Sequence, residues 1–410
     1  MPAPAERTTG APLRVLHVAY STAVWGAEQT ILRLSPLLAA RGVDVMLAAP
    51  PAGPLEAAWR DTRLPFVPID VLHHGGLRSP DGSGTRPGAF AIAREGVIVT
   101  RSAVRMAGVV GRTGCDLVHS HSLQAHLELA LAARLRRRRA VLHQHDLVVP
   151  GVGRQILGVA TQTAGELIAI STAVAGCVPE RARSHVDVVH HGVDLGRFRP
   201  GPADPEVRRA LGGGPDCVVI GILGRVDPRK RVDLVVRAIA KLDVAPAKVR
   251  LAVVGAAHLA SDDYTTNLRR DAEDLLGDRV RFVGPRDDVP DVLRALDVLV
   301  NASVAEPFGL TLVEAQACGT PVVAMRSGGA PEVVIDGATG FVVPAGDEVA
   351  LAGAIGDLLT DATRRREMGS AARRHAEAHH DIRMQADRIA EIYRRTARRK
   401  PALASSTAPR

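Results

Sequence analysis

The sequence predicts an α/β protein built from two doubly wound parallel-sheet domains. At 410 residues the chain is too long for one typical domain and fits two of about 200 residues each. Hydrophobic residues make up 46% of it, enough to fill two cores, so general disorder is excluded. Short β-branched runs alternate with longer amphipathic stretches in two series, which is typical of parallel strands connected by helices.

The two series are separated by a Pro- and Gly-rich segment at Arg197–Gly214, where we expect the linker. The expected parts are therefore residues 1–197, residues 198–380, a C-terminal helix at 381–399 that packs back towards the first domain, and a disordered tail at 400–410. A ligand should bind at the carboxyl ends of the strands, between the two domains. The strands expected in the first part are Leu13–Ala19, Val43–Ala48, Phe66–Ile69, Asp116–His119, Ala140–His143, Glu166–Ile170 and Val186–Val189.

Apolar residues at helical spacing lie between these strands and again near the end of the chain. We expect helices at Glu28–Arg41 and Leu123–Arg136, a surface loop at His73–Pro87, and helical structure over Val349–Arg399. The strands expected in the second part are Cys217–Leu223, Val249–Val254, Val280–Val283, Val298–Val300, Pro321–Ala324 and Gly340–Val343.

Composition and charge exclude several classes of protein. Aromatic residues make up only 3% of the chain, which disfavours base-stacking platforms for single-stranded nucleic acid. The net charge is +8, and the basic residues are densest at Arg134–Arg139 and at Arg394–Lys400. A solvated helix face is the simplest interpretation of these clusters, and contact with an anionic membrane surface is the alternative. The four cysteines are scattered and form no C-x-x-C pair, as expected of reduced thiols in a cytoplasmic protein. No signal-peptide core or membrane-spanning run is found, so we expect a cytoplasmic chain that is at most peripheral to the inner membrane face.

The most informative stretch runs from Glu306 to Glu314, directly after an expected strand. Gly309 frees the backbone just before a helix, and the exposed amides of Gly309, Leu310 and Thr311 would form an anion site. Two carboxylates beside a phosphate cradle make poor phosphate ligands but good acceptors for sugar hydroxyls. The alternative is that Glu314 is an ordinary helix glutamate and Glu306 a surface residue.

A second segment, Gly224-Arg225 to Lys230, lies where the first strand of the second part gives way to a loop. Arg225 and Lys230 would point into the crevice and could neutralise a diphosphate without a metal ion. Surface cations capping a turn are the alternative. No Asp-x-Asp pair occurs in the sequence, so a carboxylate-held divalent ion has no obvious ligands, and we expect no metal or other cofactor.

In this order and spacing, the segments resemble the retaining glycosyltransferases of family 4, which have the GT-B fold of two facing Rossmann-like domains. Glu306 to Glu314 match the family's E-x7-E motif with its inner Phe-Gly-Leu, and Gly224-Arg225 to Lys230 match its G-R-x-x-x-x-K segment. The resemblance spans about residues 13 to 395 and is densest in the second half. Further matches are Gly328-Gly329-Ala-Pro331-Glu332, Gly337-Ala-Thr-Gly340-Phe341, and Gly192-Val193-Asp194 with Arg197-Phe198, although His191 replaces the family's usual Asn.

The resemblance implies a retaining hexosyltransferase that uses a UDP- or GDP-sugar donor held by the second domain. Arg225 and Lys230 would bind the diphosphate and stabilise it as the leaving group, and Glu314 would hold the ribose hydroxyls. Glu306 would orient the transferred sugar, together with the backbone of Phe308, Gly309, Leu310 and Thr311. A loop near Gly284-Pro285-Arg286 would frame the base, with Arg286 as a donor-site residue. Attack from the same face as the departing phosphate would let that phosphate accept the proton, so that no carboxylate base is needed.

The first domain would bind the acceptor, a hydroxyl-bearing small molecule, glycan or lipid-linked sugar that the sequence does not identify. Trp25-Gly26-Ala27-Glu28 resembles the family's G-G-A-E turn with Trp25 in place of the first Gly, and Gly26 could let the backbone approach the donor phosphates or the acceptor. Trp25 departs from the family's glycine and could instead line the acceptor pocket.

Histidines end three of the expected strands, at His119-Ser-His121, His143-Gln-His145 and His190-His191. If these strands share one sheet, the imidazoles gather at the crevice mouth, where zinc is a less favoured alternative. The resemblance instead implies that His121 faces the reacting sugar or phosphate as a catalytic residue. It also likens His145-Asp146 to the family's acceptor-side pair, while His119 and His143 are expected to pack or to hydrogen-bond at strand ends.

Other functions explain fewer of these residues. A nicotinamide-dependent dehydrogenase needs a glycine fingerprint between strand and helix, and Gly151-Val-Gly153 has the wrong spacing. A sugar-nucleotide epimerase or hydrolase of the same fold, or a chain that only binds, remains an alternative, although the intact Glu306 and Arg225 argue against lost catalysis. A non-enzymatic polyanion-binding protein would explain the charge but not the glutamate pair, so we expect no nucleic-acid partner.

Overall fold

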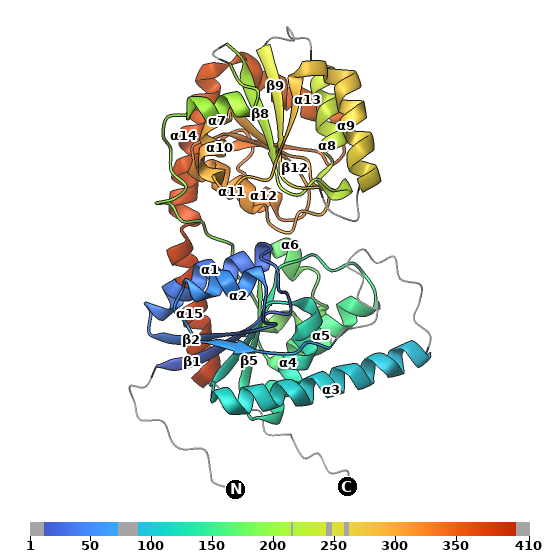
Figure 1. Cartoon of the computed structure of the whole chain (residues 1–410), viewed down its shortest axis with the longest axis vertical. Coiled ribbons are helices and arrows are strands. Elements are labelled where there is room, and N and C mark those ends of the chain that lie inside the picture. The colour runs from blue at the N-terminus through green and yellow to red at the C-terminus, as the bar shows by residue number, and fades with distance from the viewer. Residues whose placement is uncertain (1–11, 73–88, 215, 243–247, 258–261, 399–410) are drawn as a thin grey trace. The chain divides into compact units, whose positions relative to one another are not determined.

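The computed structural model describes residues 12–72, 89–214, 216–242, 248–257 and 262–398. Contacts divide the chain into two compact units (Figure 1): unit 1 runs to Val189 and resumes at Gln385, and unit 2 is His190–Met384. The first division falls before the expected boundary at residues 197 and 198. The expected loop at His73–Pro87 and the tail at 400–410 lie outside the described residues.

Unit 1 is built around a parallel sheet of seven strands in the order β3-β2-β1-β4-β5-β6-β7. The chain starts in the middle of the sheet, builds outward to β3, and then crosses to β4 on the other side of β1. Strand order therefore reverses between β1 and β4, which is where doubly wound sheets bind ligands. The strands are β1 Leu13–Val18, β2 Val43–Ala49, β3 Phe66–Pro68, β4 Leu117–Ser120, β5 Arg139–Gln144, β6 Leu167–Ala169 and β7 Val186–Val188.

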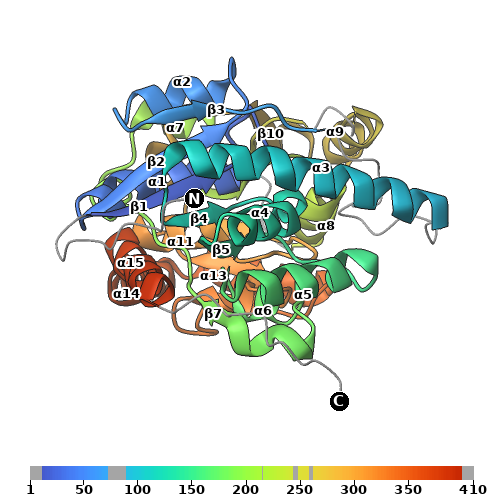
Figure 2. The same cartoon turned by 90° about the horizontal axis from the view of Figure 1, so that it is seen from below.

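Helices cover both faces of this sheet, and Figure 2 shows three of them, α3, α4 and α5, side by side. On the other face, Tyr393 of α15 packs against side chains of β1 and β4. The helices are α1 Gly26–Ala39, α2 Pro54–Arg60, α3 Ala89–Thr113, α4 Leu123–Leu135, α5 Val152–Ala164, α6 Thr172–Ala175, the 3-10 turn Glu180–His185, and α15 Ile382–Arg398, whose first residues belong to unit 2.

Unit 2 repeats this architecture with six parallel strands in the order β10-β9-β8-β11-β12-β13. Its order reverses between β8 and β11. The strands lie at the positions that the sequence predicts, because each buried β-branched run pairs with its neighbours in parallel register. They are β8 Val218–Leu223, β9 Val249–Val254, β10 Val280–Gly284, β11 Val298–Asn301, β12 Val322–Met325 and β13 Gly340–Val343.

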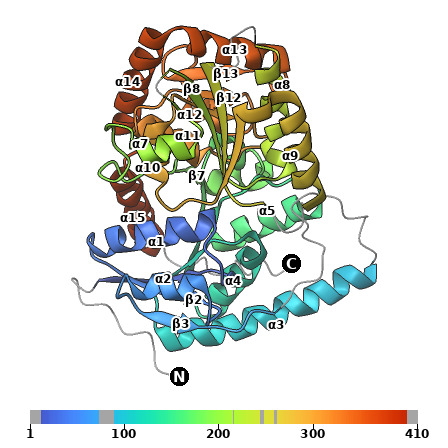
Figure 3. The same cartoon turned by 45° about the horizontal axis from the view of Figure 1, so that its top comes forward.

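The helices of unit 2 form two layers, with α8 between α9 and α13 in one of them (Figure 3). In the other, α11 contacts α10 and α14. The helices are α7 Pro205–Ala210, α8 Val232–Ala240, α9 Asp262–Leu276, α10 Val289–Ala295, α11 Leu310–Ala317, α12 Ala330–Val333, α13 Glu348–Thr360 and α14 Ala362–His379, with 3-10 turns at Pro228–Lys230 and Gly277–Arg279.

The helical structure expected over Val349–Arg399 is found as three helices, α13, α14 and α15, up to Arg398, the last described residue. Asp361 leaves helical geometry and its carboxylate accepts the amide of Arg364, which caps the start of α14. The next break comes at His380 and Asp381, where the Val193 amide donates to the His380 carbonyl at 2.8 Å and the Ile382 amide donates to the Val193 carbonyl at 3.1 Å. Hydrophobic periodicity alone does not reveal a cap of this kind inside a helical run.

One buried ion-pair group fastens α15 to the sheet of unit 1. Arg395 donates to Glu166 at 2.7 Å and also bonds Asp187, and Glu166 is only 2% exposed. Burial would raise the pKa of Asp187, but the Glu166 and Arg395 hydrogen bonds hold it below its ordinary value. The helix is thus tied to the strand edges at β6 and β7 by charge as well as by packing.

Replacing Arg395 with Met should therefore destabilise unit 1 by about 2 kcal/mol, since it leaves the buried Glu166 carboxylate without its cation. Urea unfolding followed by circular dichroism measures the change. Arg398→Met, on an exposed position of the same helix, should stay within about 0.5 kcal/mol of wild type. Equal effects of the two substitutions would contradict this role of Arg395.

Candidate active site

The two segments singled out in the second half of the sequence meet at the switch point of unit 2. Strands β8 and β11 are neighbours, paired through Gly221 and Leu299. The loop after β8 carries Gly224 and Arg225, and the loop after β11 leads to Glu306. Because the carboxyl ends of parallel strands share one edge of a sheet, segments far apart in sequence form one site.

Glu306 is held at this edge by a direct ion pair. The Lys230 Nζ lies 2.9 Å from Oε2 of Glu306, and the Asn301 amide donates to the same oxygen at 3.2 Å. Glu306 is 8% exposed. Burial would raise the pKa of Glu306, but Lys230 and Asn301 outweigh it and hold the pKa below the ordinary glutamate value. The carboxylate is therefore charged at neutral pH and its position is fixed.

Backbone hydrogen bonds hold the Glu306 loop from both sides. The Val304 amide donates to the carbonyl of Arg229 at 2.8 Å, which joins the loop to the Lys230 segment. The Ala305 amide donates to Ser327 Oγ at 2.7 Å, and the Gly329 amide donates to the Glu306 carbonyl at 2.8 Å. Three separate loops thus form one rigid support.

At Gly328 the backbones of two of these loops lie very close together. Its φ is +55°, and a Cβ there would lie 1.9 Å from the carbonyl oxygen of Glu306. Any side chain would push the two loops apart, which gives the Gly-Gly pair at 328 and 329 a physical reason.

Helix α11 starts at the same site. Gly309 precedes it with φ +99°, and the first-turn amides of Leu310 and Thr311 have no intrahelical acceptors. Such a helix start attracts anions through its amides and its dipole. Glu314 lies further along this helix and is 6% exposed.

Phe308 anchors the Glu306 loop through contacts with aromatic rings. It is 2% exposed and packs against the rings of His190, His191 and His380, at centroid distances of 5.4, 5.5 and 5.9 Å. His190 Nε2 lies 3.0 Å from the Glu332 carboxylate. His190 and His191 thus belong to unit 2 and support Phe308 there.

The two predicted arginines of unit 2 each lie near a carboxylate two residues further on. The Arg225 side chain is 39% exposed, with Nε 3.9 Å from Asp227, and follows Gly224 at the end of β8. Arg286 is held by Asp288 two residues further on, with Nε 2.7 Å from the carboxylate. That hydrogen bond raises the pKa of Arg286 above the ordinary arginine value. The structure joins Lys230 to Glu306 directly, whereas Arg286 has its own carboxylate partner.

The remaining predicted site residues, Gly26 and His121, belong to unit 1. Gly26 is the first residue of α1, and the Trp25 amide before it donates to Glu28 at 3.1 Å. The Trp25 side chain is 55% exposed. His121 follows β4 and is 5% exposed, with Nε2 3.0 Å from Nδ1 of His17.

Three contributors were missed in the sequence. Asn301 and Ser327 position the Glu306 loop, and His17 contacts His121. Asn301 could have been noticed as a polar residue ending the buried strand β11. His17 gives no such signal, because it sits inside β1 and only the crossover to β4 brings it beside His121.

Removing the Lys230 charge should lower the free energy of unfolding, because Glu306 is then buried without its cation. Lys230→Met should destabilise unit 2 by about 3 kcal/mol at pH 7, because an unpaired carboxylate stays buried. The difference from wild type should shrink as the pH falls towards 4, because the unpaired Glu306 of the variant has a raised pKa and can fold with a neutral carboxyl. The wild type keeps its ion pair until the pH falls below the lowered pKa of its Glu306. Urea unfolding at several pH values measures this.

Lys230→Met/Glu306→Gln is the matched control, since it removes both charges and should recover most of the loss. A double variant as unstable as Lys230→Met, or a difference that does not depend on pH, would contradict the ion pair's role.

Comparison with known proteins matches both halves of the chain. The family model for glycosyl transferases group 1 covers residues 204–375, and the model for glycosyltransferase family 4 covers residues 24–197. The D-inositol 3-phosphate glycosyltransferase of Streptomyces avermitilis is 32% identical over 371 residues, which is 87% of this chain and 74% of that protein. D-inositol 3-phosphate glycosyltransferase 2 of Catenulispora acidiphila is 34% identical over 384 residues, 86% of each chain.

Solved structures agree on the fold. HepE of Anabaena, in complex with UDP and glucose, has a TM-score of 0.77 at 26% identity and covers 93% of this chain and 100% of that one. A glycosyltransferase from Rickettsia africae has a TM-score of 0.78 at 18% identity, with 94% and 99% covered, and supports the fold alone. The chain is therefore a glycosyltransferase enzyme, and it belongs to glycosyltransferase family 4 with its two-domain GT-B fold.

Proposed function

We propose that this enzyme transfers a hexose, with retention of configuration, from a UDP- or GDP-sugar to a hydroxyl acceptor. The observation that carries the proposal is the support around Glu306, where Lys230, the loop after β8 and the start of α11 meet. Cationic side chains and helix amides at one sheet edge suit a diphosphate, and HepE, which this chain resembles, was solved with UDP and glucose.

In this proposal the chain's own cations replace a divalent ion. Arg225 and Lys230 bind the diphosphate oxygens, with the Gly309, Leu310 and Thr311 amides completing the cradle. Lys230 is paired with Glu306 at 2.9 Å, so a diphosphate that approaches shares this ammonium with the carboxylate. The ion pair keeps Lys230 oriented before the donor arrives, which lowers the cost of ordering it.

The two glutamates serve the two sugars of the donor. Glu314, buried on α11, accepts hydrogen bonds from the ribose hydroxyls, and Glu306 accepts them from the transferred hexose. Phe308 supports the loop, Arg286 lies beside the base-binding loop, and Gly26 of unit 1 approaches the phosphates.

Transfer breaks the bond between the sugar C1 and the diphosphate oxygen. The acceptor oxygen forms its bond to C1 on the same face, and its proton passes to the leaving phosphate. Arg225 and Lys230 stabilise the charge that develops there, and His121 contacts the reacting sugar. No protein carboxylate is needed as the base.

The acceptor is proposed from the relatives. Two relatives at 32% and 34% identity are D-inositol 3-phosphate glycosyltransferases, so a phosphorylated cyclitol is the first acceptor to test. Transfer to D-inositol 3-phosphate but not to unphosphorylated inositol would support it.

We place the reaction in the cytoplasm, with the inner membrane face as a peripheral site. Among the described helices, none has the length and apolar composition needed to cross a membrane.

Donor binding tests the assignment of the cradle. Glu314→Ala and Arg225→Ala should each weaken binding of the donor nucleotide sugar about tenfold, because each removes a charged hydrogen-bonding group. Glu306→Gln should leave affinity within about threefold of wild type and lower kcat roughly 100-fold. Calorimetry after a thermal-shift panel of UDP- and GDP-sugars gives the affinities.

Arg229→Ala is the matched control, because it removes a cation of the same loop whose side chain is 64% exposed. It should change neither affinity nor kcat. Unchanged donor affinity in both Glu314→Ala and Arg225→Ala would refute the proposed cradle.

A further inference from the structure

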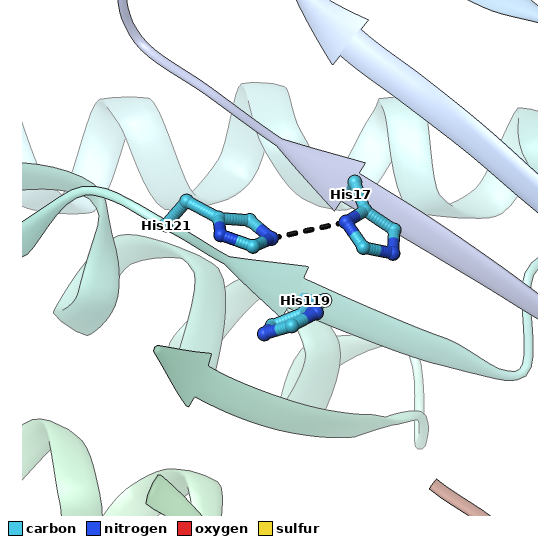
Figure 4. Close-up of side chains that lie close together, drawn as sticks. All are labelled: His17, His119 and His121. Carbon is cyan, nitrogen blue, oxygen red and sulfur yellow. Dashed lines mark hydrogen bonds between the residues drawn. The ribbon is translucent and has the colours of Figure 1, made fainter. Parts of the chain in front are cut away.

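We propose that unit 1 carries a transition-metal site of the zinc type, formed by His17, His119 and His121 at the carboxyl ends of β1 and β4. Figure 4 shows the three imidazoles together, one from β1 and two from the end of β4. This edge is the switch point of the unit 1 sheet. Its three ligands all belong to unit 1, whereas unit 2 builds the diphosphate cradle, and the metal site needs no donor to form.

The topology explains why these residues meet. His17 and His119 are register partners in the parallel pair of β1 and β4, so their side chains leave the same face of the sheet. His121 is two residues beyond His119 and so lies on that face too. The ring centroids are 4.8 Å apart for His17 and His119 and 4.1 Å apart for His119 and His121.

The distances suit one shared ion. One ligand nitrogen from each imidazole lies within 4.8 Å of the other two. His17 Nδ1 and His121 Nε2 are 3.0 Å apart. Two nitrogens on a tetrahedral zinc ion are about 3.3 Å apart, given Zn–N bonds of about 2.0–2.1 Å. Small side-chain rotations therefore suffice to bring the three nitrogens to one ion.

A buried nitrogen without a partner points to the same site. His119 is fully buried, and its Nε2 has no hydrogen-bond partner among the described residues. Its Nδ1 bonds the Tyr393 hydroxyl, so either tautomer leaves Nε2 unsatisfied, as a bare lone pair or as a lone N–H. A metal ion satisfies the lone-pair tautomer.

Tyr393 orients two of the ligands. Its hydroxyl oxygen lies beside His119 Nδ1 and 3.2 Å from His17 Nε2. With both imidazoles donating their N–H to this oxygen, the His119 Nε2 and His17 Nδ1 lone pairs become available to one ion. Hydrogen bonds from metal-ligating histidines to an oxygen acceptor are the usual outer support of such sites.

The charge state of the three histidines also suits zinc binding. Burial lowers the pKa of His17 to about 3 and the pKa values of His119 and His121 well below the ordinary histidine value, with neighbouring imidazoles adding to the effect for the latter two. The rings are therefore neutral near pH 7, so metal binding needs a change of tautomer but no net loss of a proton. Three neutral imidazoles with an open fourth position are a common zinc ligand set.

A second histidine set adjoins the first. His121, His143 and His145 also bring ligand nitrogens within 4.8 Å of one another, and His145 Nε2 lies 3.2 Å from His121 Nδ1. We assign the ion to His17, His119 and His121 because Tyr393 orients two of them. His145 is less buried and marks the side from which an ion would enter.

Zinc binding has a consequence for turnover that rests on the proposed function. An ion on Nε2 of His121 withdraws this residue from the reacting sugar, so zinc should inhibit transfer. The metal site does not depend on that role. Zinc binding with no effect on transfer would count against the role of His121 alone.

Metal binding to the untagged, chelator-treated full chain tests the site. The background is His375→Gln/His379→Gln, which removes a histidine pair one turn apart on α14, with ring centroids 4.7 Å apart. Calorimetry should show one zinc ion per chain, and Co²⁺ should give the visible spectrum of a low-coordinate nitrogen site. No binding of either ion to this folded protein would overturn the proposal.

Substitutions in that background assign the ligands. His17→Gln should abolish the zinc signal, and Tyr393→Phe should weaken zinc affinity by about 10- to 100-fold while both proteins stay folded by circular dichroism. His126→Gln is the control: His126 is buried on α4 but bonds Ser120 and Gln144, and it should bind zinc like wild type. Zinc binding that survives His17→Gln but not His143→Gln would overturn the assignment to His17, His119 and His121.

Discussion

Lys230 and Glu306 come from loops 76 residues apart, and a 2.9 Å contact between their charged groups holds those loops together. A carboxylate this buried is stable only with its cation and its amide donor, so its position depends on the whole surrounding support. The bond from Val304 to Arg229 and the approach of Gly328 to the Glu306 carbonyl follow from the same constraint.

Both units place their polar groups at the same topological position. In each sheet the strand order reverses between its first and fourth strands, β1 and β4 or β8 and β11. Unit 2 fills this position with cations, a carboxylate and helix amides, whereas unit 1 fills it with neutral imidazoles under Tyr393. One backbone arrangement thus provides, as we propose, an anion site in one unit and a cation site in the other.

The sequence predicts the fold and much of the site in outline, because buried β-branched runs and loop motifs are local features. It places Arg225 and Lys230 after one strand and Glu306 after another. It does not reveal that Lys230 and Glu306 bind each other, since that contact depends on β8 lying beside β11. His17 was missed for the same reason, because its partner is 104 residues away across a sheet crossover. The break at Asp361 was missed because its capping hydrogen bond interrupts an otherwise helical run.

The central claim is that Lys230, Arg225 and the start of α11 hold a diphosphate beside Glu306. A crystal structure of the enzyme with UDP tests it most directly. The account predicts diphosphate oxygens within hydrogen-bonding distance of Arg225, Lys230 and the Leu310 or Thr311 amides, with a Glu314 oxygen on the ribose hydroxyls. UDP bound elsewhere, or a diphosphate there that touches neither Arg225 nor Lys230, would contradict it.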